Sequence, residues 1–282
     1  MSDQEAAREL ALEVRGLRKV FRIRAEGSRG TDDLVAVDDV SFQLPASGAL
    51  AVVGESGSGK STVARIIAGL ERPTAGTVLI RGTERSSRRP RSAERRIRSR
   101  QVQMVFQDPY SSLDRRQTVR TALNEVLRLH TSLDQRGRDQ RVRDLLLQVG
   151  LDERHEGLRP RSLSGGQRQR VAIARALACD PDVLILDEAV SALDVSVQGQ
   201  VLNLLADLRS QVGVAYLFVS HDLAVVQQVT DEAVVMHKGR IVEAGPTDQI
   251  LTDPQQEYTK RLLAAVPRPG WKPVRRTQAA TR

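Results

Sequence analysis

The sequence predicts an α/β fold built on a parallel β-sheet, and two observations support this prediction. Continuous apolar runs of strand length, typical of strands buried on both faces, occur at residues 50–53, 183–186, 214–219 and 233–236. Stretches with apolar residues at helical spacing separate the later runs, at about residues 168–178, 197–209 and 223–229. Strands that alternate with helices form a parallel sheet with helices on its faces.

The N-terminal part has a different pattern, that of antiparallel strands. Residues 10–25 are predicted to form a strand and its exit, and residues 26–33 a polar turn or loop. Residues 35–44 alternate apolar and polar side chains, as strands with one buried face do. Residues 45–48 are predicted to form the turn before the first buried run.

Two further helical regions are predicted. The first follows a glycine-rich loop, begins at about Lys60 and groups four apolar residues on one face: Val63, Ile66, Ile67 and Leu70. The second spans about residues 115–160 and reads as a mostly helical insert, in which Gly150 ends one helix.

Composition indicates the compartment in which the protein works. Cys179 is the single cysteine, so no disulfide can form within the chain, and we expect a packed residue in a reducing compartment. No segment has the ~18 uncharged apolar residues of a membrane span, and the N-terminus lacks a secretory signal, so we expect a soluble, cytoplasmic protein.

The net charge of +8 is concentrated in two segments. Residues 81–100 carry nine arginines against two acids, and residues 268–282 carry five basic residues and no acid. We interpret the first as solvated, Arg-rich loops and the second as a basic, poorly ordered tail. A surface for nucleic acid or anionic lipid is the alternative.

The most specific motif is a phosphate-binding loop, G-x-x-x-x-G-K-[ST], between a predicted strand and a predicted helix. Backbone N–H groups of such a loop surround phosphate oxygens, and the start of the helix adds positive potential. Lys60 is predicted to reach the β- and γ-phosphates of a nucleotide, and Ser61 to hold Mg²⁺. The predicted nucleotide-binding residues of the loop are Gly54, Glu55, Ser56, Gly57, Ser58, Gly59, Lys60, Ser61 and Thr62.

Two acids, Asp187 and Glu188, follow the apolar run at residues 183–186. An isolated pair of this kind is usually a solvated strand end, but downstream of a phosphate loop it indicates a catalytic role. Asp187 is predicted to bind the metal, mostly through water, and Glu188 to polarise the attacking water as the general base.

A third motif precedes a helix predicted to begin near Arg168. Serine and two glycines at a helix start can bind anionic oxygens, whereas a plain turn needs no such specific sequence. The residues of this motif are Leu163, Ser164, Gly165, Gly166 and Gln167.

Together these motifs resemble the ABC ATPases over about residues 10–265. The resemblance implies that Gln107 is the Q-loop glutamine, which contacts Mg²⁺ and senses the γ-phosphate, and that His221 is the switch histidine, which contacts the γ-phosphate. It also implies an aromatic ring, Phe21, stacked on adenine. Residues similar to the family's D-loop are Ser191, Ala192, Leu193 and Asp194.

The implied fold is a P-loop NTPase core with a parallel sheet, an antiparallel β subdomain and an inserted helical subdomain at about residues 115–165. Residues 52–57, 106–113, 191–198 and 257–267 are similar to the oligopeptide, dipeptide and nickel importer ATPases. That subfamily implies a C-terminal extension at about residues 246–267. Departures from the family pattern, which remove no catalytic group, occur at Phe21, Asp114, Arg161, Ser162 and Ala189.

The resemblance implies an ATP-binding and ATP-hydrolysing subunit of a bacterial ABC transporter, with ATP and Mg²⁺ as cofactors. Two such chains, identical or paralogous, are expected to close head to tail, with ATP between Lys60 of one chain and residues 164–166 of the other. The region at residues 107–113 is expected to pass this motion to two integral membrane permease subunits.

The implied cargo is a peptide or a similar small solute, imported with the help of an extracytoplasmic solute-binding protein. The expected location is the cytoplasmic face of the inner membrane, and no nucleic acid partner is expected. Three alternatives stay open at this point: an exporter subunit, a non-transport ABC ATPase working on nucleic acid or ribosomes, and a nucleotide-binding scaffold without activity. His130, His155 and Trp271 are interpreted as structural or surface residues.

Overall fold

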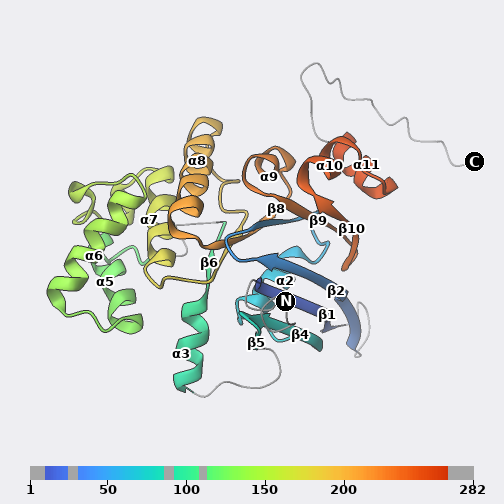
Figure 1. Cartoon of the computed structure of the whole chain (residues 1–282), viewed down its shortest axis with the longest axis horizontal. Helices are drawn as coiled ribbons and strands as arrows, with labels where there is room; N and C mark the ends of the chain where they lie inside the picture. The colour runs from blue at the N-terminus through green and yellow to red at the C-terminus, as the bar shows by residue number, and fades with distance from the viewer. Residues whose placement is uncertain (1–9, 25–30, 86–91, 108–112, 266–282) are drawn as a thin grey trace, which may run out of the picture.

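The computed structural model describes residues 10–24, 31–85, 92–107 and 113–265, and its architecture confirms the predicted fold class (Figure 1). A six-stranded sheet forms the centre, a four-stranded sheet lies beside it, and a layer of helices lies on the opposite side of the central sheet. Several predictions fall outside the described residues: those for residues 26–30, residues 108–112, the end of the C-terminal extension and the basic tail.

The central sheet has the strand order β10-β9-β3-β8-β7-β6. All neighbours pair in parallel except β10, which is antiparallel to β9. Every residue of β3, β7 and β8 is buried, which explains their continuous apolar sequences. The strands are β3 (Ala49–Val53), β6 (Val102–Val105), β7 (Val183–Asp187), β8 (Ala215–Ser220), β9 (Glu232–His237) and β10 (Arg240–Pro246).

The smaller sheet is antiparallel and has the order β2-β1-β4-β5. The predicted loop at residues 26–33 is wrong for its last three residues, which belong to β2. They extend the strand because they pair with the end of β1, where Arg22 lies opposite Asp33 and Arg24 opposite Thr31. The strands are β1 (Leu10–Arg24), β2 (Thr31–Pro45), β4 (Ala75–Ile80) and β5 (Thr83–Glu84).

Helix α2 (Lys60–Ile67) joins the two sheets, since its buried Val63, Ile66 and Ile67 belong to a core that includes residues of both. The prediction that Leu70 continues this apolar face is wrong. Leu70 is 61% exposed because the helix ends before it: Gly69 has a φ of +76° and donates its N–H to Ile66.

The helical layer consists of α5 (Val119–His130), α6 (Gln135–Gln148) and α7 (Gly165–Leu177), seen at the left of Figure 1. Gly150 follows the end of α6 with a φ of +68° and donates its N–H to Leu147, which confirms its role as a helix stop. Helix α7 begins three residues before the predicted start, because Ser164 caps it.

The remaining helices are α8 (Val195–Val212), α9 (Leu223–Val229), α10 (Thr247–Thr252) and α11 (Glu257–Ala264), and α8 starts two residues earlier than predicted. Within the described parts of the chain, no helix combines the length and apolar character needed to cross a bilayer. Cys179, after α7, is the packed residue that we predicted, and burial raises the pKa of its thiol to about 11.

The prediction of solvated loops for the Arg-rich segment is wrong in part. Its residues 92–100 lie in α3 (Ser92–Gln101), which is a helix but is solvated, because none of its residues is buried. Arg85 and Arg98 each donate to the backbone carbonyl of the other, which fixes the helix against the chain end of β5. Burial, together with the nearby Arg98, lowers the pKa of Arg85 to about 10.

Candidate functional site

The site lies at the carboxyl edge of the central sheet. Because β3, β7 and β8 are parallel, the residues that follow them meet at one edge. The glycine-rich loop follows β3, Asp187 ends β7 with Glu188 directly after it, and His221 follows β8. Residues more than 100 positions apart in the sequence are therefore neighbours here.

The glycine-rich loop approaches its surroundings too closely for side chains at two positions. A Cβ atom at Gly54 would lie 2.2 Å from the carbonyl oxygen of Met236, and one at Gly59 would lie 2.4 Å from that of Ala36. Both glycines have positive φ, at +149° and +105°. Glycine is therefore required where the loop passes against β9 and β2.

The start of α2 fits a polyphosphate. Gly59 accepts the first intrahelical hydrogen bond, from Val63, so the N–H groups of Lys60, Ser61 and Thr62 have no partner within the helix. No side chain caps this end. Free N–H groups next to a lysine, at the positive end of a helix, are the chemistry that binds phosphate oxygens.

Lys60 is buried, at 5% exposure, and its ammonium group donates to two loop carbonyls. The distances from Nζ to Gly54 O and Glu55 O are 2.7 and 2.8 Å. Burial lowers the pKa of Lys60, and the charges of Glu188, Asp187 and Glu55 oppose this shift. An ammonium has three donors, so one remains to reach a phosphate.

Asp187 is the second buried charged side chain of this site, at 9% exposure. Ser61 Oγ donates to its Oδ1 over 3.3 Å. Burial raises the pKa of Asp187, the hydrogen bond from Ser61 lowers it, and the charge of Glu188 raises it further. A hydroxyl and a carboxylate side by side, with a second carboxylate nearby, fit a hard divalent cation such as Mg²⁺.

Glu188 lies in a chain of polar contacts at the same edge. Its Oε1 is 3.0 Å from His221 Nδ1, and its backbone carbonyl accepts from Ser191 Oγ at 2.9 Å. Gln107 Nε2 donates to Ser191 Oγ at 3.3 Å. Glu188 itself has a φ of +49°, a strained backbone conformation of the kind that gathers at functional sites.

The motif at residues 163–167 forms the capped start of α7. Ser164 Oγ accepts from Gln167 N at 3.2 Å, and Gln167 Oε1 accepts from Ser164 N at 2.9 Å, which is a capping box. His155 Nε2 lies 3.2 Å from Gln167 Nε2. His155 also completes a capping box with Asp152, which confirms that it is a structural residue.

The same motif packs on residues that follow β7 in its own chain. A Cβ at Gly165 would lie 3.5 Å from Leu193 Cδ2, and one at Gly166 would lie 2.4 Å from Val197 Cγ1. The structure therefore places the motif beside Leu193 and the first turn of α8. Among the described residues, its side-chain hydrogen bonds stay within the motif and with His155.

Phe21 lies near the end of β1, with the Lys19 ammonium 4.6 Å from the centre of its ring. Lys19 is held by Glu71 Oε1 at 2.7 Å and by the Arg72 carbonyl at 2.8 Å. The ring is half-buried, so it can offer a face to a planar base.

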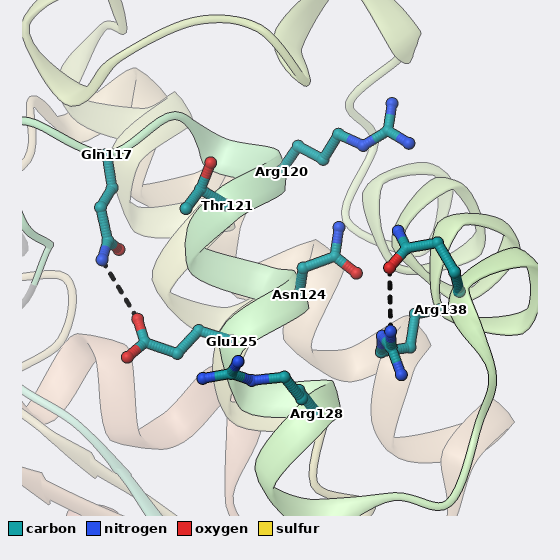
Figure 2. Close-up of a pocket in the computed structure, with 8 residues that line it drawn as sticks. Gln117, Arg120, Thr121, Asn124, Glu125, Arg128 and Arg138 are labelled. Atoms are coloured by element: carbon teal, nitrogen blue, oxygen red, sulfur yellow. Dashed lines mark hydrogen bonds between the residues drawn. The ribbon is translucent and has the colours of Figure 1, made fainter.

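A hollow in the helical layer, of about 440 Å³, is separate from this site (Figure 2). Its polar groups pair with one another, as Gln117 does with Glu125 and Arg138 with Gln135. The residues that line it are Gln117, Arg120, Thr121, Asn124, Glu125, Arg128, Gln135 and Arg138, and none of them belongs to the predicted site.

The fold and this edge of the sheet define a P-loop ATPase. Comparison with known proteins gives the family. Residues 37–191 match the family model described as ABC transporter, and the chain belongs to this family. It is an ATP-binding and ATP-hydrolysing ABC transporter subunit.

Curated relatives align over nearly the whole chain. The dipeptide transport ATP-binding protein DppF of Escherichia coli is 45% identical over 95% of this chain and 80% of its own length. The di/tripeptide transport ATP-binding protein DppF of Pseudomonas aeruginosa is 45% identical over 92% of this chain and 80% of its own length. The glutathione import ATP-binding protein GsiA of Escherichia coli is 46% identical over 92% of this chain, which covers 41% of that protein.

Solved structures agree with the fold. An ATP-binding cassette solved as a dimer in a post-hydrolysis state, with ADP and Pi bound, has a TM-score of 0.71 and 26% identity over 84% of this chain and 98% of its own. The cbiO1 protein of Clostridium perfringens, part of the ABC transporter complex cbiONQ, has a TM-score of 0.72 and 26% identity over 87% of this chain and 92% of its own.

Proposed function

We propose that this chain hydrolyses ATP to power the import of dipeptides or similarly short peptides through a membrane transporter. The observation that carries the proposal is the 45% identity to a dipeptide transport protein over 95% of this chain. The other relatives bear names that refer to di- and tripeptides, peptides and glutathione, which are all small peptide-like solutes.

The phosphates of ATP bind the glycine-rich loop and the free N–H groups at the start of α2. Lys60 uses its remaining donor on the β- and γ-phosphates, and Phe21 stacks on adenine. Mg²⁺, when bound, would neutralise phosphate charge, and Ser61, Asp187 and Gln107 would hold it. Glu188 accepts the proton of the attacking water, with His221 beside it to orient the carboxylate and contact the γ-phosphate.

The start of α7 serves a second subunit. Residues 163–167 of one chain face the ATP that is bound to Lys60 of the other, where the helix start adds positive potential. The D-loop residues Ser191 to Asp194, packed against α7, link the two half-sites. The second subunit is a copy of this chain or a paralogue, and closure of the pair excludes water and completes the site.

Two permease subunits hold the pair at the cytoplasmic face of the inner membrane, and an extracytoplasmic solute-binding protein delivers the peptide. We assign the ATPase domain to residues 10–265, with the helical subdomain at about 115–165, the extension at about 246–267 and the basic tail outside it.

Affinity purification of the tagged chain from native membranes, in mild detergent, tests the assembly. Two polytopic membrane proteins should co-purify, with or without a second ATPase. Uptake of a labelled dipeptide should then fall when the gene is disrupted and return with the intact chain, but not with Lys60→Ala. Co-purification of nucleic acid or ribosomal subunits in place of membrane proteins would refute a transport role, and unchanged dipeptide uptake would refute the cargo.

A further inference from the structure

The C-terminal segment at residues 257–267 has no role in the site as described so far. Its described part is α11, and one residue of that helix reaches the phosphate loop. The hydroxyl of Tyr258 accepts a hydrogen bond from the backbone N–H of Glu55 at 3.3 Å, across 203 positions of sequence. The Tyr258 ring also packs on His237 at the end of β9, with ring centres 3.9 Å apart.

This hydrogen bond falls on the peptide unit that also supports Lys60. The N–H of Glu55 and the C=O of Gly54 belong to one planar trans peptide, so they point to opposite sides of the chain. The carbonyl accepts from Lys60 Nζ at 2.7 Å. One rigid plane is therefore held by Tyr258 on one side and holds Lys60 on the other.

The peptide has little other freedom of position but can still rotate about its own axis. Gly54 lies so close to the Met236 carbonyl that even a Cβ cannot be added. The hydrogen bond to Tyr258 opposes this rotation, and hydrogen bonds in series also polarise one another in the protein interior. A change in the Glu55 N–H direction would turn the Gly54 carbonyl away from Lys60.

Helix α11 is held in place by contacts of its own, so the position of Tyr258 is fixed relative to the central sheet. The carboxylate of Glu243 on β10 accepts the backbone N–H groups of Gln255 and Gln256, at 2.7 and 3.3 Å, just before the helix. Thr259, the neighbour of Tyr258, is 1% exposed.

We propose that Tyr258 is a positioning residue of the nucleotide site: it holds the Gly54–Glu55 peptide so that Lys60 is aimed at the phosphates. The inference rests on the proposed role of Lys60 as a phosphate ligand. It gives the C-terminal extension a function within its own subunit, which is to organise the phosphate loop before nucleotide binds.

The test is Tyr258→Phe in the purified full-length chain, which removes the hydroxyl and keeps the ring on His237. The dissociation constant for Mg·ATPγS, measured by titration calorimetry, should rise about three- to tenfold, as expected for one lost hydrogen bond. In steady-state hydrolysis KM should rise with kcat nearly unchanged, because the chemical groups at Glu188 stay in place.

The matched control is Tyr216→Phe, the same chemical change in the core. Tyr216 is buried and its hydroxyl donates to the Leu205 carbonyl at 3.0 Å, away from the loop. This variant should melt at a lower temperature and bind Mg·ATPγS as the wild type does. If both variants bound Mg·ATPγS more weakly by the same factor, a general loss of stability would explain the effect, and this result would contradict a positioning role for Tyr258.

A double-mutant cycle with Lys60→Ala separates the two hypotheses, with thermal melting to confirm that each variant is folded. If Lys60→Ala leaves binding unchanged, the proposed role of Lys60 is wrong. If Lys60→Ala weakens binding and Tyr258→Phe does not, only the inference about Tyr258 is overturned. If Tyr258→Phe weakens binding equally with and without Lys60, Tyr258 acts by another route and the inference is again overturned. The expected result is an effect of Tyr258→Phe that disappears in the Lys60→Ala background.

Discussion

Replacement of Gly54 by alanine should destabilise the protein through two effects, and the structure separates them. The first is backbone strain, because the φ of Gly54 is +149°, a conformation that residues with a side chain rarely adopt. The second is a clash, because the new Cβ would lie 2.2 Å from the Met236 carbonyl oxygen, where real Cβ contacts essentially never fall below 3.0 Å. Relief requires a shift of the loop away from β9, to which β3 is paired.

The size of the effect follows from these two terms. Backbone strain costs about 1–3 kcal/mol, and overpacking in a rigid environment costs about as much again. A total of about 2–6 kcal/mol, at about 2–4 °C per kcal/mol, corresponds to a fall in Tm of about 4–24 °C for a chain of this size. The shift would also displace the Gly54 carbonyl that Lys60 uses, so nucleotide affinity should fall as well.

Two other glycines provide matched controls. Gly57 has a φ of +80° but nothing within 4 Å of its Cβ position, so Gly57→Ala should show the strain without the clash. Gly199, within α8, has neither feature, and Gly199→Ala should stabilise by about 0.5–1 kcal/mol because alanine favours helix.

Thermal unfolding without nucleotide, followed by circular dichroism or calorimetry, should rank the proteins by Tm. The expected order, from highest to lowest, is Gly199→Ala, wild type, Gly57→Ala and Gly54→Ala. If Gly54→Ala melts no lower than Gly57→Ala, the close approach to Met236 does not constrain the loop and the reasoning is refuted.

Three further predictions concern the site. Glu188→Gln should lower kcat about 10²–10⁴-fold with Mg·ATP still bound, and intact steady-state hydrolysis would show that Glu188 is not the base. Asp187→Asn should raise Tm at neutral pH in the absence of Mg²⁺. Burial raises the pKa of Asp187 above 3.8, so the wild type loses stability as the pH rises through the folded-state pKa and the carboxylate becomes charged. The difference in Tm between the variant and the wild type should therefore widen from acid to neutral pH. A gap that does not change with pH would contradict this. Ser164→Ala should cost about 1 kcal/mol in urea unfolding through loss of the α7 cap, whereas Ser164→Asp, which can still cap, should unfold like the wild type.

The elements that the sequence predicted well are those whose burial leaves a periodic pattern. Strand β7 is buried at every position and reads as a continuous apolar run, and the apolar face of α2 reads as a helix. Helix α3 has no buried residue, so its sequence contains no periodicity to detect. The start of α7 at Gly165, by contrast, could have been predicted, because the capping box of Ser164 and Gln167 is a pattern visible in the sequence.

The candidate site could be predicted in part because a parallel sheet imposes its own geometry. Once β3, β7 and β8 are known to be parallel, the residues after them must share an edge, and Ser61 meets Asp187 across 126 positions for that reason. No such rule places Tyr258. Helix α11 belongs to no repeating unit of the sheet, and its position depends on individual contacts such as those of the Glu243 carboxylate. Contacts of this kind leave no periodic pattern in the sequence. For that reason the sequence indicated only a family extension at residues 257–267, and the contact of Tyr258 with the phosphate loop became visible only in the folded chain.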